Sequence, residues 1–295
     1  MDVLSDVIST MRIGVPHSSR TRHVGPWRDQ FPAAPGAGFH IVLAGSCLLI
    51  PDNGAPLTLR VGDVAFLGRG IGHALTAVPG ETDAETVLLC GAYQLDPSRA
   101  HPLLEGLPDV LHLPARLGHD ASVRATVELL ASELERDLPG SSSTVVALLD
   151  VLLLLILRTW LGETSTLTTG WAAALQDPGI AAALRAMHED IARPWTIPEL
   201  ATVAGMSRAT LARRFTALVE RAPLAYLTWW RLTTAARLLR DSDATLAVIA
   251  HQVGYSSEYA FAAAFKRQHN LAPGRYRATT SPHEQSVRDF SLRSG

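Results

Sequence analysis

The chain has 295 residues, with 26 basic side chains, 28 acidic ones and a net charge of −2. That length leaves room for two domains. Its only cysteines are Cys47 and Cys90, too few for a disulfide scaffold. The segment from Met1 to Met11 contains two aspartates and lacks a basic start, so we expect no secretory signal there. These features predict a cytoplasmic protein with reduced thiols.

The charge is divided unevenly along the chain. From Pro178 to the end there are 15 basic and 9 acidic side chains, a balance of +6, whereas the preceding 177 residues hold 11 and 19, a balance of −8. A basic half beside an acidic half is typical of a DNA-binding domain joined to a separate regulatory domain. Taken alone, this balance also fits solvated charge without a partner.

The segment from about Pro26 to Pro114 is rich in Gly and Pro and is broken into short apolar runs. Turn signals such as Asp52-Asn53-Gly54 separate these runs. Several short strands at this spacing favour a small β-sandwich or barrel. The predicted strands are 39–50, 57–67, 73–78 and 85–95.

Two motifs in this region resemble those of the cupin barrel. Gly62-Asp63, followed ten residues later by His73, is similar to the second cupin motif, and Gly38-Phe39-His40 is similar to a remnant of the first. The paired histidines and the glutamate of a catalytic cupin are missing, because Ile41-Val42 follows His40. The resemblance therefore implies a ligand-sensing cupin-like domain at 1–115, and it argues against an oxygenase or isomerase.

Two histidines and two cysteines in this region are candidates for a sensor or metal site. Imidazole and thiolate suit zinc, and four such donors would complete a tetrahedral shell. Their spacing carries no metal-binding signal, so buried structural groups are favoured, with a metal-binding or thiol-redox sensor as the alternative. The candidate residues are His40, Cys47, His73 and Cys90.

Apolar periodicity predicts two helices, at 121–138 and 144–161, with Thr144 as the cap of the second. The apolar run at 145–157 contains Asp150 and is shorter than the about 20 residues that a membrane span needs. We therefore expect a buried helix and no membrane association. The excess of apolar surface favours a helical dimerisation element at 116–162, with complete burial in one domain as the alternative. A linker is expected at 163–177.

Two similar stretches follow, about 49 residues apart, at 200–215 and 249–265. In each, an apolar-periodic segment ends at a glycine, a serine able to cap a helix follows (Ser207 and Ser256), and the next helix closes on a phenylalanine. Helix, tight turn and capped helix is the helix-turn-helix pattern, whose second helix enters the major groove of DNA. The second copy carries one extra residue before its phenylalanine.

The rest of this half supplies caps and a connector. Asp177-Pro178 begins a helix, and Thr196 to Glu199 is a capping box that opens the first motif. The segment 223–240 predicts a long helix joining the two motifs, and either Asp243 or Thr245 caps the second one.

The order of these elements resembles the DNA-binding domain of the AraC/XylS family. The residues that carry the resemblance are Arg231-Leu232, Val253-Gly254-Tyr255, Phe265-Lys266 and the ending Pro273 to Arg277. The resemblance implies a ligand-responsive, usually dimeric transcription factor, with double-stranded promoter DNA and RNA polymerase as partners. It places the DNA-binding domain at 178–280 and leaves 281–295 as a disordered tail. The expected fold class is α+β and multidomain, with a cupin-like barrel, a helical pair and an all-α domain.

The resemblance also assigns DNA contacts. In the first motif Arg213 is the candidate for a contact to guanine, Arg208 and Arg214 for phosphate, and Leu200, Leu211 and Val203 are expected in the core. In the second motif Glu258 can accept from cytosine, Tyr259 can contact thymine methyls, and an alanine stands at 263 where the family commonly has arginine. We therefore expect the first helix to specify the sequence and the second to anchor. The full set is Ser207, Arg208, Ala209, Thr210, Ala212, Arg213, Arg214, Ser256, Ser257, Glu258, Tyr259, Ala262, Lys266 and Arg267.

These observations predict a non-enzymatic, sequence-specific regulator that responds to a small effector, a metal or thiol oxidation. Two other classes remain: a cupin-type metalloenzyme with auxiliary DNA binding, and an architectural DNA-binding protein without a signal input.

Overall fold

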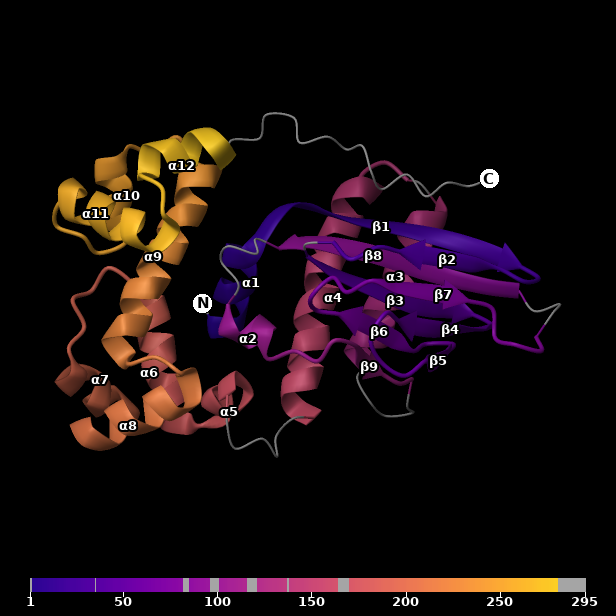
Figure 1. Cartoon of the computed structure of the whole chain (residues 1–295), viewed down its shortest axis with the longest axis horizontal. Coiled ribbons are helices and arrows are strands. Elements are labelled where there is room, and N and C mark those ends of the chain that lie inside the picture. The colour runs from indigo at the N-terminus through magenta and orange to yellow at the C-terminus, as the bar shows by residue number, and fades with distance from the viewer. Residues whose placement is uncertain are drawn as a thin grey trace. The chain divides into compact units, whose positions relative to one another are not determined.

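The computed structural model describes residues 2–34, 36–81, 85–95, 101–115, 121–136, 138–163 and 170–280 (Figure 1). These residues form two compact units: one holds Asp2–Ala181 with the short segment Ala217–Glu220, and the other holds the remaining residues from Ala182 onward. The start of the predicted helical element, at 116–120, and the predicted tail at 281–295 lie outside the described residues.

The amino-terminal unit is built on two antiparallel sheets, as the prediction of a cupin-like fold requires. One sheet has the strand order β1-β8-β3-β6-β9 and the other β2-β7-β4-β5. The strands are β1 Arg12–Val24, β2 Arg28–Phe31, β3 Ala37–Ala44, β4 Ser46–Pro51, β5 Leu57–Arg60, β6 Val64–Leu67, β7 His73–Thr76, β8 Glu85–Leu95 and β9 Leu111–Leu113. The single strand predicted at 39–50 is therefore two strands, β3 and β4, which belong to different sheets.

Apolar side chains from both sheets fill the space between them. Along β4 half-buried and buried residues alternate, as expected for a strand with one face in a core. Cys47 and Cys90 belong to this core, and both are free thiols. Its other members are Val42, Leu49, Leu59, Ala65, Leu67, Leu75 and Leu88.

Four helices accompany the sheets: α1 Val3–Met11, α2 Pro102–Glu105, α3 Ala121–Arg136 and α4 Ser141–Glu163. Helices α3 and α4 pack on each other, and both contact β1. The Tyr93 hydroxyl on β8 donates to the Leu149 carbonyl of α4 at 2.7 Å. Arg12 on β1 pairs with Asp150 of the same helix. A buried hydrogen bond and an ion pair therefore fix the middle of α4 to the sheet.

Helix α4 is longer than its predicted bounds. It begins at Ser141, and the Thr144 hydroxyl donates to the Gly140 carbonyl, so the predicted cap at Thr144 is wrong. Among the described residues α4 is long and apolar enough to cross a membrane by length and composition alone. Only 33% of its most apolar window is buried, and Val151 is 44% exposed. The helix is therefore buried on one side, not all round as the sequence suggested.

Part of the predicted linker at 163–177 is also helical. Gly170–Gln176 forms α5, which contacts α2, and Trp171 packs edge-on against His101 with ring centroids 4.3 Å apart. Trp171 and Ala174 are buried. The predicted linker therefore contains a short helix, which the buried Trp171 side chain anchors against His101.

The carboxy-terminal unit is helical, with one long helix through its centre. Its helices are α6 Pro178–Glu189, α7 Ile197–Ala204, α8 Arg208–Val219, α9 Pro223–Asp241, α10 Leu246–Gln252, α11 Glu258–His269 and α12 Pro273–Thr280. The predicted cap at Asp177 is confirmed, because its carboxylate accepts from the amides of Gly179 and Ile180, both at 3.0 Å. Thr245, and not Asp243, caps α10.

Helix α9 contributes to both helix-turn-helix motifs. Tyr226 in its first half packs on Phe215 of the first motif, with ring centroids 5.9 Å apart. Its second half belongs to a core cluster with α10, α11 and α12, in which Leu232, Ala236 and Leu239 contact residues such as Phe261 and Phe265. The predicted connector is thus confirmed as a shared core element.

Arg231 lies on α9 between these two halves. Its guanidinium donates to the carbonyls of Ile191 at 2.8 Å, Ala192 at 3.2 Å and Arg193 at 2.7 Å. These carbonyls follow the end of α6, where no helical partner is available to them. Partial burial lowers the pKa of Arg231, but the group stays charged at any physiological pH. Arg231 therefore holds the chain that enters the first motif against the connector.

Alanine substitutions of the glycines in the two turns should distinguish the energetic cost of a steric clash from the cost of an unfavourable backbone conformation. Gly205 (φ +64°) has open space where a Cβ would lie, whereas a Cβ on Gly254 (φ +81°) would lie 2.6 Å from the Ala192 carbonyl oxygen. We expect Gly205→Ala to cost roughly 1–2 kcal/mol of unfolding free energy, and Gly254→Ala roughly 3 kcal/mol or more. Urea unfolding of both variants measures this, and equal losses would contradict the packing argument.

Candidate nucleic-acid interface and sensor cluster

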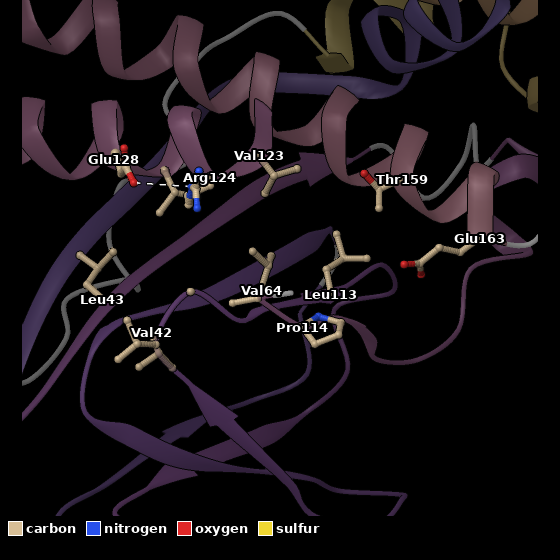
Figure 2. A pocket seen from close by; sticks show the side chains of 14 residues that line it. Val42, Leu43, Val64, Leu113, Pro114, Val123, Arg124, Glu128, Thr159 and Glu163 are labelled. Carbon is tan, nitrogen blue, oxygen red and sulfur yellow. Dashed lines mark ion pairs between the residues drawn. The ribbon is translucent and has the colours of Figure 1, made fainter. Parts of the chain in front are cut away.

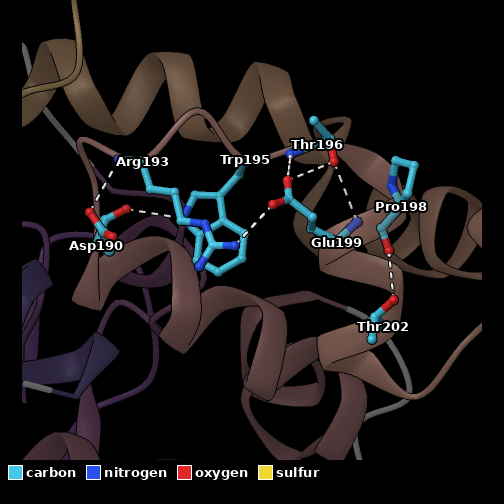
Figure 3. Close-up of polar contacts among 7 residues, drawn as sticks. All are labelled: Asp190, Arg193, Trp195, Thr196, Pro198, Glu199 and Thr202. Carbon is cyan, nitrogen blue, oxygen red and sulfur yellow. Dashed lines mark hydrogen bonds and ion pairs between the residues drawn. The ribbon is translucent and has the colours of Figure 1, made fainter.

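The first helix-turn-helix motif begins at the predicted capping box (Figure 3). The Glu199 carboxylate accepts from the Thr196 amide at 2.9 Å, and the Glu199 amide donates to the Thr196 hydroxyl at 3.4 Å. Hydrogen bonds from Thr196 and then from Arg193 lower the pKa of Glu199 to about 2. Arg193 also lies over the Trp195 ring, 4.1 Å from its centroid. This network sets the direction in which α7 starts.

Helix α8 presents a basic face to solvent. Ser207 caps it as predicted, accepting from the Thr210 amide at 3.1 Å. Arg208 and Arg213 are exposed, and neither makes a hydrogen bond or ion pair with another described residue. Leu211 and Phe215, on the opposite side, are fully buried. The helix therefore holds its core face in place while two free guanidinium groups remain available.

The other predicted contacts of this helix are also accessible. Ser207, Ala209 and Arg214 are exposed, and Thr210 and Ala212 are half-buried. Val203 on α7, which was expected in the core, is 41% exposed, so that expectation is wrong. Val203 lies beyond the buried pair Leu200 and Ala201, on the side of α7 that faces away from the core.

The second recognition helix, α11, begins one residue later than its predicted cap implies. Ser257, not Ser256, accepts from the Ala260 amide at 3.3 Å, so the predicted cap at Ser256 is wrong. The extra residue of the second repeat therefore lies in the turn, and the two helices have the same spacing from capping serine to closing phenylalanine. Ser256 is exposed in the turn itself.

An aromatic side chain dominates the exposed face of α11. Tyr259 is 86% exposed, the largest value among the exposed large hydrophobic side chains. Glu258, Lys266 and Arg267 are exposed as well, and Ala262 is half-buried. The Tyr259 ring is therefore accessible to a partner of this helix. Ala260, exposed beside Tyr259, was missed, and placing the cap at Ser257 would have included it.

Three of the four sensor candidates form a buried chain of hydrogen bonds. His40 lies 2.7 Å from His73 between their Nε2 atoms, and its Nδ1 lies 3.0 Å from the Cys90 sulfur. The Nδ1 of His73 lies 2.9 Å from the Ile71 carbonyl oxygen. Cys47 is not in this chain, although it shares the surrounding core with Cys90.

The Ile71 carbonyl, at one end of these hydrogen bonds, determines which atom carries the proton in each of them. A carbonyl only accepts, so His73 must carry its proton on Nδ1 and, when neutral, accepts on Nε2. His40 then donates from Nε2, and its Nδ1 accepts from the Cys90 thiol. The hydrogen bonds therefore run in one direction, from Cys90 through His40 and His73 to the Ile71 carbonyl.

Burial keeps this cluster neutral. Burial, and then the neighbouring His73, lower the pKa of His40 to about 3, and burial also lowers the pKa of His73. The pKa of Cys47 is raised to about 12 by burial and then by Asp63, and burial raises the pKa of Cys90 as well. Uncharged imidazoles and protonated thiols are thus the stable forms.

These donors do not fit a zinc site. The two nitrogens of His40 point to different partners, so His40, His73 and Cys90 do not converge on one position. Among the residues that the structure describes, no group of three His, Cys, Asp or Glu side chains could hold a metal ion. The predicted tetrahedral set is therefore wrong in this geometry.

Comparisons with known proteins agree with both units. Residues 2–162 match the cupin family model, and residues 200–279 match the helix-turn-helix domain model. An AraC-like transcription regulator of Streptomyces antibioticus is 35% identical, over 96% of this chain and 100% of its own. The RCS-specific transcriptional activator RclR of Escherichia coli is 32% identical, over 81% of this chain and 83% of its own.

Among solved structures, the DNA-binding domain of AdpA in complex with a target DNA is similar over 35% of this chain and 92% of its own. The identity is 36% and the TM-score 0.34. The matches to these two regulators, over 96% and 81% of this chain, and the two family models agree with the capped recognition helices described above. The chain belongs to the AraC family of DNA-binding transcription regulators and carries a cupin-like amino-terminal domain.

Proposed function

We propose that this protein regulates transcription in the bacterial cytoplasm by binding specific promoter DNA as a homodimer, in response to a small ligand. It acts without enzymatic activity, and RNA polymerase is its further partner. The observation that carries the proposal is the exposed face of the two capped helices, where Arg208, Arg213 and Tyr259 project from rigid elements without internal partners. DNA-binding measurements on the full chain, described below, test it.

The two helices have different chemistry, and this supports a division of labour. Helix α8 offers guanidinium groups, which can contact guanine O6 and N7 in a bidentate manner. Helix α11 offers Tyr259, small alanines and Glu258 on its exposed face, with Lys266 and Arg267 in its last turn. We therefore assign sequence reading to α8, and to α11 shape-complementary contact and phosphate anchoring.

The chemistry of the amino-terminal unit favours one kind of signal over the others. A small ligand ranks first, because the histidines and thiols do not converge on a metal position. Thiol oxidation ranks second: Cys90 contacts His40, and the similar protein RclR is described as RCS-specific. The raised pKa of both thiols opposes this second candidate, since thiolates are the reactive form. The same donor geometry also argues against the metalloenzyme alternative.

The outer side of the helical pair supports dimerisation. Leu129 on α3 is 58% exposed and Val151 on α4 is 44% exposed, although both helices are anchored to the sheet on their other sides. Exposed apolar residues on adjacent rigid helices suit a symmetric contact with a second copy. A homodimer would place four recognition helices on one operator.

Arg213→Ala and Lys266→Ala should change DNA binding differently. We expect Arg213→Ala to cost roughly 1–3 kcal/mol on the specific operator and to relax the choice at one or two base pairs. Lys266→Ala should weaken all sequences alike and reduce the salt slope by about one. Fluorescence anisotropy on operator and random duplexes measures both, with Arg158→Ala on α4 as the control. An equal loss on both duplexes for Arg213→Ala would refute the division of labour.

Charge on the helical pair should dissociate the dimer. Leu129→Glu with Val151→Glu buries like charges in the proposed contact, so sedimentation velocity should show monomers, with weaker binding to an operator that has two half-sites. Val24→Glu is the matched control, because Val24 is 71% exposed on β1. Unchanged dimers in the double variant would place the interface elsewhere.

The buried His40 should make the amino-terminal unit sensitive to acid. Because its folded pKa lies near 3, against 6.5 for the free side chain, only the unfolded state takes up a proton between these values. The free energy of unfolding is therefore unaffected by the titration of His40 above pH 6.5. Below pH 6.5 it falls on acidification, by roughly 1.4 kcal/mol per pH unit. We expect urea unfolding to show a shallower pH slope for His40→Gln than for the exposed control His17→Gln. Identical slopes would contradict this prediction.

A further inference from the structure

A cavity of about 420 Å³ lies where one edge of the sheets meets α3 and α4 (Figure 2). Its sheet side is formed by β3, β6 and β9, through Val42, Val64 and Leu113, and its helical side includes Val123 and Val127 of α3. This volume falls within the range of about 300–1,000 Å³ that is typical of small-molecule sites. Most of the lining is aliphatic, so the cavity suits an apolar body.

The polar groups of the cavity come from the two helices. Arg124 and Glu128 lie one turn apart on α3 and pair with each other at 3.9 Å. Thr159 and Glu163 lie one turn apart on α4 and line the other end, as Figure 2 shows. Glu163 forms no ion pair with another described residue. After the internal pairing, one carboxylate remains to meet a ligand.

The position of Glu163 adds to its negative charge. It is the last residue of α4, and the carbonyls at the carboxyl end of a helix carry the negative end of its dipole. A cation is therefore favoured at this end of the cavity, and an anion is disfavoured. The opposite end holds the exposed Arg124–Glu128 pair, whose two charges offset each other, and the sheet side of the cavity offers aliphatic surface.

The sheet side of the cavity is held firmly. Asp63 is buried, and its carboxylate accepts from the amides of Ala115 at 2.8 Å and Arg60 at 3.0 Å. The first of these bonds ties the turn before β6 to the segment after β9, and Gly62 and Ala115 both line the cavity. The site therefore has one rigid wall from the sheet and one from the helical pair.

From this geometry we propose that the cavity is the effector site, and that it takes an apolar small molecule with a primary amine or similar cationic head, the head lying at Glu163. The inference rests on the proposed function as a ligand-responsive regulator. A ligand here contacts sheet and helices together, so its binding free energy depends on how α3 and α4 pack on the sheet. The same helices carry the proposed dimer contact.

Three ten-carbon probes with different heads test the site: decylamine, decanol and decanoate, each displacing the fluorescent reporter N-phenyl-1-naphthylamine from the full-length protein at pH 7.5. We expect decylamine to bind most tightly and decanoate most weakly, with a difference on the order of tenfold for one charge contact at a partly exposed site. Failure of all three probes to bind, or tightest binding by decanoate, would overturn the proposal.

Two variants assign the binding to this cavity. Val127→Trp fills it and should abolish displacement, whereas Ala125→Trp, on the exposed side of the same helix, should leave binding unchanged. Glu163→Gln should remove the preference for decylamine over decanol while retaining decanol binding. The Glu163 variant does not depend on packing, so it decides the matter if Val127→Trp does not fold. A preference for the amine that survives Glu163→Gln would overturn the assignment of the head.

DNA anisotropy on the same samples separates this proposal from the proposed function. Amine binding that is lost in Val127→Trp, with operator affinity changed by decylamine in the wild type only, supports the effector site. If the wild type binds the operator but none of the probes, the proposed effector site is wrong, and the proposed function as a DNA-binding regulator is unaffected. If the wild type binds no DNA under any condition, the proposed function fails, whatever the probes do.

Discussion

The three hydrogen bonds of Arg231 set the geometry on which DNA reading depends. Without them, the carbonyls of Ile191, Ala192 and Arg193 would have no helical partners at the point where the chain turns toward α7. A single planar guanidinium satisfies all three from α9, the helix that belongs to both motif cores. Such charge-assisted bonds are roughly twice as strong as neutral ones. The start of the first motif is thus fixed relative to the connector.

The same guanidinium also lies beside the turn of the second motif. A Cβ on Gly254 would approach its terminal nitrogen to 2.7 Å and the Ala192 carbonyl to 2.6 Å. The entry to α7, the middle of α9 and the turn before α11 therefore meet at one point. This junction ties the two motifs together through close contacts that tolerate little displacement, so it limits how far α8 and α11 can move relative to each other.

The sequence predicted the carboxy-terminal unit well because its signals are local. A capping box at Thr196, a serine cap at Ser207 and a periodic connector each follow from neighbouring residues. Two details there were predicted wrongly. The cap lies at Ser257 and not at Ser256, because the turn of the second motif is one residue longer. Val203 is exposed because it lies on the face of α7 that points away from the core. The exposure of Arg213 and Tyr259 was expected from the family resemblance, which assigned both to DNA contacts.

The amino-terminal unit was harder to predict because its contacts are long-range. Strand β1, Arg12–Val24, is rich in polar residues and lies at the edge of its sheet, where β8 is its one partner among the described strands. Apolar alternation therefore does not reveal it. His40 and Cys90 are register partners on β3 and β8, whereas His73 on β7 meets His40 from the other sheet. No local sequence pattern specifies either contact. The cavity residues on α3 and α4 carried no signal, because their shared position arises only from packing of helices on the sheet.

The filled barrel explains why a ligand would bind outside it. Cys47, Leu49, Leu59 and Leu75 are all fully buried between the sheets, and the hydrogen-bonded chain of His40, His73 and Cys90 pairs the polar groups there with one another.

A ligand entering that space would have to displace close-packed side chains and break a chain of hydrogen bonds that is satisfied from end to end. A ligand in the cavity between the sheet and the helical pair would need neither change. Strand β8 lies between the two regions, with Cys90 in the interior and Tyr93 bonded to α4. In this arrangement the barrel acts as a rigid support, and the helical pair is the part whose packing a ligand can change.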